Sequence, residues 1–204
     1  MTAPDEKKMD FDELMGFEAN SPIRHEYIGG RLYAMAGGTV KHSDIGTNIG
    51  ASVHTRLRGK PCRGGNGDQR VRFDRTENWY YPDFLIKCPP YSFHPRDKEA
   101  LMNPRAIFEV LSPKTQVFDR TGKFDQYKTN DELSDYILVS ADEVRVEHFR
   151  KLENGDWAQR VLIGREALLQ LDNFDISVPL SEIYEDIEIE TQPVLPFEND
   201  DELH

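Results

Sequence analysis

The sequence lacks the features that mark several large classes of protein. No apolar run approaches the roughly 20 residues that a membrane-spanning helix needs. The first residues are polar and acidic, which is not the pattern of a secretory signal. We therefore expect a protein without a membrane segment, located in the cytoplasm.

Cysteine is scarce, because the 204 residues contain only Cys62 and Cys88. Two cysteines do not make a structural zinc site, which usually has four ligands. In a reducing compartment we expect free thiols here rather than a disulfide.

Three common motifs of catalysis and nucleotide binding are also missing. The sequence has no G-x-x-x-x-G-K-[ST] loop and no G-x-G-x-x-G after a strand, which gives no support to a nucleotide-binding fold. It has no G-x-S-x-G, which argues against a serine hydrolase of that type.

Positive charge is in short supply and unevenly placed. The formal net charge is −12, and from Ser181 onward there are nine acids and no Lys or Arg. The segment from Arg56 to Arg75 instead holds seven basic residues against two acids. This segment is either a solvated surface or a set of phosphate contacts. We expect residues 188–204 to form an acidic C-terminal arm, which could cover the basic segment.

The hydrophobic pattern predicts mixed secondary structure in one domain spanning residues 1–187. A four-residue recurrence of Ile45, Ile49, Val53 and Leu57 predicts a helix over 41–58, and Gly29-Gly30 predicts the turn of a hairpin over 24–36. We predict further helices over 10–18, 117–129 and 181–187, and loops over 59–69 and 88–104. Predicted strands cover 69–74, 81–87, 105–112, 135–140, 144–151, 157–163 and 174–178. This order indicates an α/β or α+β protein with helices packed on one sheet.

Two acids lie inside apolar, strand-like segments. Asp83 occurs in Tyr-Pro-Asp-Phe-Leu-Ile and Glu109 in Ile-Phe-Glu-Val-Leu. A buried carboxylate is costly unless it has a partner or a metal ion. Each acid alone could be a satisfied structural carboxylate, but two on neighbouring segments favour a metal site. Two carboxylates and a backbone carbonyl suit Mg²⁺ or Mn²⁺, because Mg²⁺ usually keeps several waters.

Lys123 is the cation that could act beside this metal site. It lies in the predicted helix after the second acid, and Asp119, Lys123 and Tyr127 share one helix face. The competing interpretation is an ordinary Asp119–Lys123 surface pair, worth a few tenths of a kcal/mol.

The ordered set of these motifs resembles a known family. The strings Y-P-D-F-L-I, E-V-L-S-P-K-T, D-R-T-G-K-F-D-Q-Y and D-Y-I-L-V are similar to those of the Uma-type restriction endonuclease family, within the PD-(D/E)XK nuclease-like superfamily. The hairpin E-Y-I-G-G-R-L, an early helical His42, and Arg70-Val71-Arg72-Phe73 match as well. The resemblance covers about residues 10–185. It implies an α/β restriction-endonuclease-like fold with a mixed central sheet, flanking helices and an extra antiparallel hairpin.

The resemblance also implies roles for individual residues. Asp83 and Glu109 would be the metal ligands, with the Val110 carbonyl as a third. The lysine that the superfamily places two residues after the second acid is replaced by Leu111, and Lys123 would take that role. Glu26 would be a further ligand or a base. Arg70, Arg72 and His42 would contact the substrate.

The implied activity is metal-dependent hydrolysis of phosphodiester bonds in DNA, by a homodimer on the analogy of related folds. The alternative is a catalytically impaired module on the same fold that binds nucleic acid or a protein partner. Leu111 and the negative net charge are the features that favour this alternative.

Overall fold

The computed structural model describes residues 9–35, 37–73, 77–113 and 115–189. The acidic arm predicted for 188–204 falls almost wholly outside them. The helices are α1 (Phe11–Asn20), α2 (Val40–Leu57), α3 (Gln116–Phe118), a π-helical segment η1 (Asp119–Lys123), α4 (Phe124–Tyr127), a 3₁₀ segment η2 (Asp172–Phe174) and α5 (Leu180–Ile183). The strands are β1 (His25–Ile28), β2 (Arg31–Ala34), β3 (Arg63–Asn66), β4 (Val71–Arg72), β5 (Trp79–Tyr80), β6 (Phe84–Lys87), β7 (Phe93–His94), β8 (Asp97–Leu101), β9 (Pro104–Leu111), β10 (Asp135–Ser140), β11 (Arg145–Lys151), β12 (Trp157–Ile163), β13 (Leu168–Leu171) and β14 (Ile176–Pro179).

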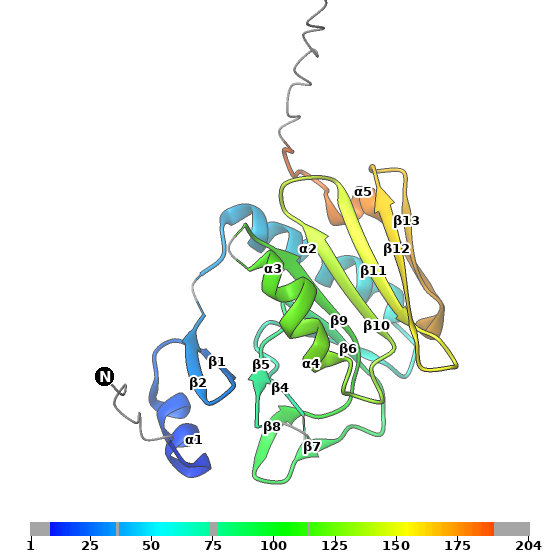
Figure 1. Ribbon diagram of the computed structural model, residues 1–204. Helices are drawn as coiled ribbons and strands as arrows, with labels where there is room; N and C mark the ends of the chain where they lie inside the picture. Colours follow the sequence, from blue (N-terminus) through cyan, green and yellow to red (C-terminus); the bar gives the residue numbers. More distant parts are fainter. Residues whose placement is uncertain (1–8, 36, 74–76, 114, 190–204) are drawn as a thin grey trace, which may run out of the picture.

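The main sheet has six strands in the order β12-β11-β10-β9-β6-β3. Its central pair, β9 and β10, is parallel, and the other pairs are antiparallel, so the sheet is mixed as predicted. Figure 1 shows α2 behind this sheet and the helix that runs from α3 to α4 in front of it. The central strands are buried on both faces for this reason.

Two apolar clusters lie on the two faces of the main sheet. The predicted stripe of α2 is fully formed, and it packs with β13, β14 and α5 against one face. On the other face, Phe124 and Tyr127 of α4 pack against β9 and β10, together with Val71 and Tyr80. The sheet therefore holds its strands, including the segment with Glu109, in a rigid apolar frame.

A second sheet, in the order β2-β1-β5-β4-β8-β7, carries the predicted hairpin. Gly29 and Gly30 form its turn with φ values of 59° and 90°, a backbone region that favours glycine. Helix α1 begins with a capping box, in which Asp10 and Glu13 each accept a hydrogen bond from the other's backbone N–H. Among the described residues, no helix is long and apolar enough to cross a membrane.

Two predicted loops contain strands. The glycine-rich segment 59–69 includes β3, whose Gly64 lies against the Phe84 ring, so that an added Cβ would come within 2.5 Å of that ring. The low β propensity of glycine hid this strand, because its value here is close approach rather than side-chain packing. The long segment 88–104 contains β7 and β8, and we also missed β5 and β13.

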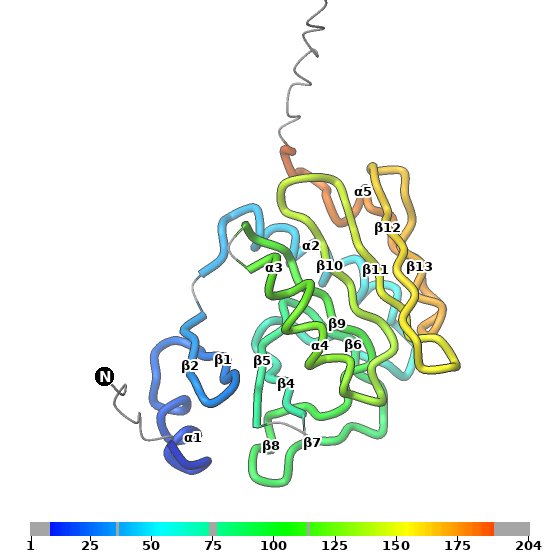
Figure 2. Tube along the Cα trace, in the orientation of Figure 1, coloured from blue at the N-terminus to red at the C-terminus, as the bar shows by residue number. Residues whose placement is uncertain are grey.

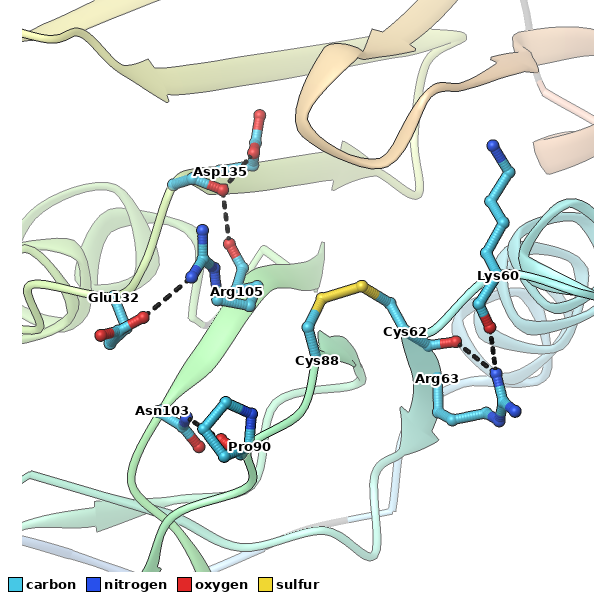
Figure 3. Close-up of a disulfide and its surroundings, with 10 residues drawn as sticks. Lys60, Cys62, Arg63, Cys88, Pro90, Asn103, Arg105, Glu132 and Asp135 are labelled. Atoms are coloured by element: carbon cyan, nitrogen blue, oxygen red, sulfur yellow. Dashed lines mark hydrogen bonds and ion pairs between the residues drawn. A yellow bond between two sulfur atoms is a disulfide. The ribbon is translucent and has the colours of Figure 1, made fainter.

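The expectation of free thiols is wrong in this structure, because Cys62 and Cys88 form a disulfide. Figure 3 shows the bond between the start of β3 and the end of β6. The antiparallel register pairs Arg63 with Lys87, so the two cysteines are the next residues opposite each other, with Cα atoms 4.1 Å apart. The two cysteines come together because β3 and β6 pair in this register. The spacing of the cysteines in the sequence does not indicate that pairing.

The disulfide predicts a measurable loss of stability on reduction. It closes a loop with a sequence separation of 26 residues, and a loop of this size corresponds to about 3 kcal/mol of unfolded-state entropy. We expect dithiothreitol to lower the free energy of urea unfolding by about this amount. Cys62→Ser with Cys88→Ser is the matched variant, and its stability should not respond to reductant. Equal midpoints for the oxidised and reduced wild type would contradict the prediction.

Candidate active site

A lysine ammonium group lies among buried carboxylates at the edge where the two sheets meet. Lys123 Nζ of η1 is 3.0 Å from Glu26 Oε1 of β1 and 3.0 Å from Glu109 Oε1 of β9. Asp119 Oδ1, one helical turn earlier, is 3.8 Å from the same nitrogen. Three segments distant in the sequence thus converge on one cation.

Asp83 joins this group from the start of β6. Because Phe84 pairs with Phe108 in the antiparallel register of β6 and β9, Asp83 lies next to Glu109 on the neighbouring strand. Its Oδ2 accepts a hydrogen bond of 2.7 Å from the Val110 N–H and lies 3.3 Å from Nε2 of His42. The backbone of β9 therefore fixes the carboxylate of Asp83 beside that of Glu109.

The helix that carries Lys123 differs from the predicted one in its middle. Residues Asp119–Lys123 form a π-helical segment between α3 and α4, and such segments are frequent at functional sites. Figure 2 shows the three pieces as one continuous rod in front of the main sheet. Arg120 of this helix forms an ion pair with Glu147 of β11. The Tyr127 hydroxyl donates a 3.0 Å hydrogen bond to Glu109 Oε1. These contacts hold Lys123 and Asp119 toward the acids.

Exposure shows which part of the group solvent can reach. The side chains of Lys123, Glu109 and Asp119 are 7%, 5% and 5% exposed. Asp83 and His42 are more open, at 22% and 24%. A ligand would therefore enter from the side of Asp83 and His42, with Lys123 at the back of the site.

The electrostatics of the group favour an additional positive charge. Burial raises the pKa of Glu109 well above its usual range; Lys123 opposes this effect, and the neighbouring carboxylates add to it. The pKa of Asp119 is raised mainly by burial too. Lys123 has a strongly raised pKa because the attraction of Glu109, Glu26 and Asp119 outweighs the effect of burial.

Two of these acids, Asp83 and Asp119, also raise the pKa of His42. Its hydrogen bond to Asp83 raises its pKa, against an opposing effect of burial. His42 lies in the first turn of α2, and Gly38 lets its ring approach, because a Cβ at Gly38 would come within 2.7 Å of Nδ1. The group thus has four carboxylates against one ammonium and one titrating imidazole.

The donors present fit a magnesium-type ion. Carboxylate oxygens are the ligands that Mg²⁺ prefers, and it needs only one or two of them when waters complete its shell. Asp83 and Glu109 can supply this pair. Among the described residues, no three His, Cys, Asp or Glu side chains are arranged to enclose a metal ion by themselves. The arrangement therefore suits an open, partly hydrated site rather than a closed protein cage.

Most of the predicted site residues come together. Asp83, Glu109, Val110, Lys123 and Glu26 meet in the group described above, with His42 at its open side. Asp119, which shares the predicted helix face with Lys123, also belongs to the group, although we predicted no role for it. Its i, i+4 spacing from Lys123 was the signal for a site residue.

Arg70 and Arg72 lie apart from the group, in the second sheet. Arg70 pairs with Asp97 at 2.8 Å and donates to the Tyr81 hydroxyl, and Arg72 lies over the ring of Phe11. Both residues are buried. Other members of the basic segment are paired as well, Arg56 with Glu182 and Lys60 with Asp175. Arg75 lies outside the described residues.

Comparisons with known proteins agree with this fold. A family model described as "Uma2: Putative restriction endonuclease" matches residues 10–181. An uncharacterized protein of Synechocystis sp. is 33% identical over 182 residues, which cover 87% of this chain and 92% of the relative. A second uncharacterized protein of Synechocystis sp. is 27% identical over 158 residues, covering 78% of this chain and 89% of that one.

A solved structure has the same fold. The crystal structure of "a putative nuclease belonging to DUF820" from Anabaena variabilis matches with a TM-score of 0.70 and 16% identity, covering 86% of this chain and 97% of that chain. This match supports the restriction-endonuclease-like architecture predicted from the sequence. The family model spans most of the described residues, including all the acids around Lys123. The chain therefore belongs to the Uma2 family of restriction-endonuclease-like proteins.

Proposed function

We propose that the protein is a metal-dependent endonuclease that hydrolyses phosphodiester bonds in DNA. The observation that carries the proposal is the convergence of Glu26, Glu109 and Asp119 around the buried ammonium of Lys123, with Asp83 beside Glu109 on the neighbouring strand. A purely structural lysine needs one partner, and this excess of acids is costly to bury unless bound protons or a further cation balance it.

Asp83, Glu109 and the Val110 carbonyl are the groups that would hold Mg²⁺ or Mn²⁺. A bound ion of this kind neutralises charge on the phosphate and lowers the pKa of bound water. The N–H of Val110 holds the Asp83 carboxylate in place, and the Tyr127 hydroxyl does the same for Glu109. Hydrogen bonds within the protein thus orient the carboxylates of Asp83 and Glu109 before any ligand binds.

Lys123 supplies a fixed positive charge at the back of the site. Its raised pKa keeps it protonated, so it serves as a hydrogen-bond donor to a phosphate oxygen or to the attacking water rather than as a base. Glu26 orients the ammonium at 3.0 Å and is the less buried of its two nearest acids. Lys123 could therefore supply the positive charge that the superfamily's lysine supplies. The residue at that lysine's position here, Leu111, has no charged group and is buried in the apolar core.

The alternative is a non-catalytic module on this fold that binds nucleic acid or a protein partner. It is favoured by Leu111, which is buried in an apolar cluster, and by the net charge of −12. Calorimetric titration with Mn²⁺ separates the two proposals, because only the nuclease requires binding at the acids. A homodimer that addresses both DNA strands remains a proposal by analogy with the fold.

The first prediction concerns the two metal acids. We expect Asp83→Ala and Glu109→Ala to abolish Mg²⁺- or Mn²⁺-dependent nicking of supercoiled plasmid, because each removes an oxygen ligand. Glu132→Ala is a matched control, since it removes an acid from an exposed pair with Arg105. Wild-type nicking rates in either site variant, at equal purity, would refute the assignment.

The second prediction concerns pH. Glu109 binds a proton at unusually high pH, and protonated His42 pairs with Asp83, so protons compete with a metal ion at both acids. Affinity for Mn²⁺ should therefore rise, up to about tenfold per displaced proton and pH unit, as pH increases through the raised pKa values of Glu109 and His42.

Calorimetry in buffers of different ionisation enthalpy should show proton release on binding over the same range. In His42→Ala the pH dependence should be weaker, because one competing proton is gone. An affinity that does not change with pH would count against metal binding at these acids.

The third prediction concerns Lys123. Lys123→Met removes the cation and leaves buried carboxylates uncompensated, which should lower the free energy of unfolding by about 3 kcal/mol. The acids then bind protons more tightly in the folded state, so this deficit should shrink as pH falls through their raised pKa values. Nicking should fall by about a hundredfold where the variant is folded. A deficit of equal size at low and neutral pH would contradict this electrostatic role.

A further inference from the structure

Exposed apolar and aromatic side chains lie beside the candidate active site. Tyr33, Phe118, Val117 and Val40 are 50%, 38%, 72% and 79% exposed. Each belongs to or adjoins an element that also carries Glu26, Asp119 or His42 of the candidate site. We call Tyr33 and Phe118, the two aromatic members, the rim pair.

Tyr33 is placed by the hairpin. In the register of β1 and β2 it lies directly opposite Glu26, and opposed residues of an antiparallel pair project from the same face. Glu26 uses that face to reach Lys123. The opposite face carries Tyr27, which is buried against Trp79. The exposed ring of Tyr33 therefore lies on the face of the hairpin that is turned to the active site.

Phe118 is placed by the helix. It directly precedes Asp119, and its ring lies on Gly122, where a Cβ would come within 2.7 Å of the ring. The opposite flank of the helix faces β11, through Arg120 and Phe124. Gln126, four residues after Gly122, contacts Asn78 beside β5, the neighbour of β1. The flank with Phe118 is therefore on the side of the helix that faces β5 and the hairpin.

The charges near this rim do not suit an intact duplex. Binding to duplex DNA depends on many Lys and Arg contacts with phosphates. In the basic segment, Arg56, Lys60 and Arg70 already have acidic partners. Beside the site, Lys41 at the start of α2 has no ion pair with any described residue, which allows a phosphate contact. Each unpaired base that stacks on an aromatic ring adds to binding without a further cation.

Resting on the nuclease function proposed above, we propose that the preferred substrate is DNA whose bases are unpaired beside the bond that is cut, with Tyr33 and Phe118 as the stacking surface. An unpaired base can stack on the ring of Tyr33 or Phe118, and the phosphate of the same nucleotide can approach Lys41. Stacking then accounts for the exposure of these two aromatic rings, which a purely structural role does not explain.

Binding of short oligonucleotides tests the proposal. The full chain carrying Glu109→Gln, which keeps the side-chain shape, is titrated in Mg²⁺ with a fluorescent single-stranded DNA and with its duplex. We expect tighter binding of the single strand, with a shallow dependence on salt. Adding Tyr33→Ala or Phe118→Ala should weaken single-strand binding about tenfold each, whereas Tyr33→Phe and Phe118→Tyr should restore it.

Tyr91→Ala is the matched control, because Tyr91 is 41% exposed but follows the far end of β6 from Asp83. It should leave binding unchanged. Unchanged binding in both alanine variants of the rim pair, or equal losses in Tyr91→Ala, would overturn the stacking role. Preferential binding of the duplex would overturn the substrate class.

Cleavage by the wild-type chain separates this inference from the proposed function. Metal-dependent cutting of single-stranded or gapped DNA in preference to duplex supports both. Cutting of intact duplex at an equal or higher rate overturns the inference and leaves the nuclease proposal standing. Cutting of neither substrate, with no Mn²⁺ binding, overturns the proposed function, and with it the inference.

Discussion

The arrangement of the site depends on one buried ammonium group and the acids that surround it. Lys123 is 3.0 Å from both Glu26 and Glu109, which come from two different sheets, and Asp119 approaches from its own helix. Burying these charges is tolerated because they compensate one another. The compensation is incomplete, since the acids outnumber the cation, and this imbalance is the basis of the proposal that the site binds a divalent ion.

The fold supplies this arrangement from rigid parts. Strands β6 and β9 place Asp83 beside Glu109 by register, and the Val110 N–H fixes the first carboxylate. Apolar packing on both faces of the main sheet holds these strands. The π-helical segment and the Arg120–Glu147 contact orient Lys123. Among the described side chains of the group, those of Asp83 and His42 are the most exposed.

Much of this could be predicted from the sequence, because strong local patterns specify it. The stripe of α2, the Gly29-Gly30 turn and the acids within apolar strands each have a direct physical reading. What escaped prediction depends on pairing between distant segments. Strand β3 and the Cys62–Cys88 bond exist only through register with β6, and the burial of Arg70 depends on Asp97 of β8. No local pattern encodes such partners.

The most direct test of the account is a crystal of the full chain grown with Mn²⁺, measured for anomalous scattering. The account predicts one ion held by Asp83, Glu109 and the Val110 carbonyl, with the Lys123 ammonium still in contact with Glu26. Absence of an anomalous peak at these acids at saturating Mn²⁺, with Lys123 still held between Glu26 and Glu109, would contradict it. The acids would then serve only to hold the lysine.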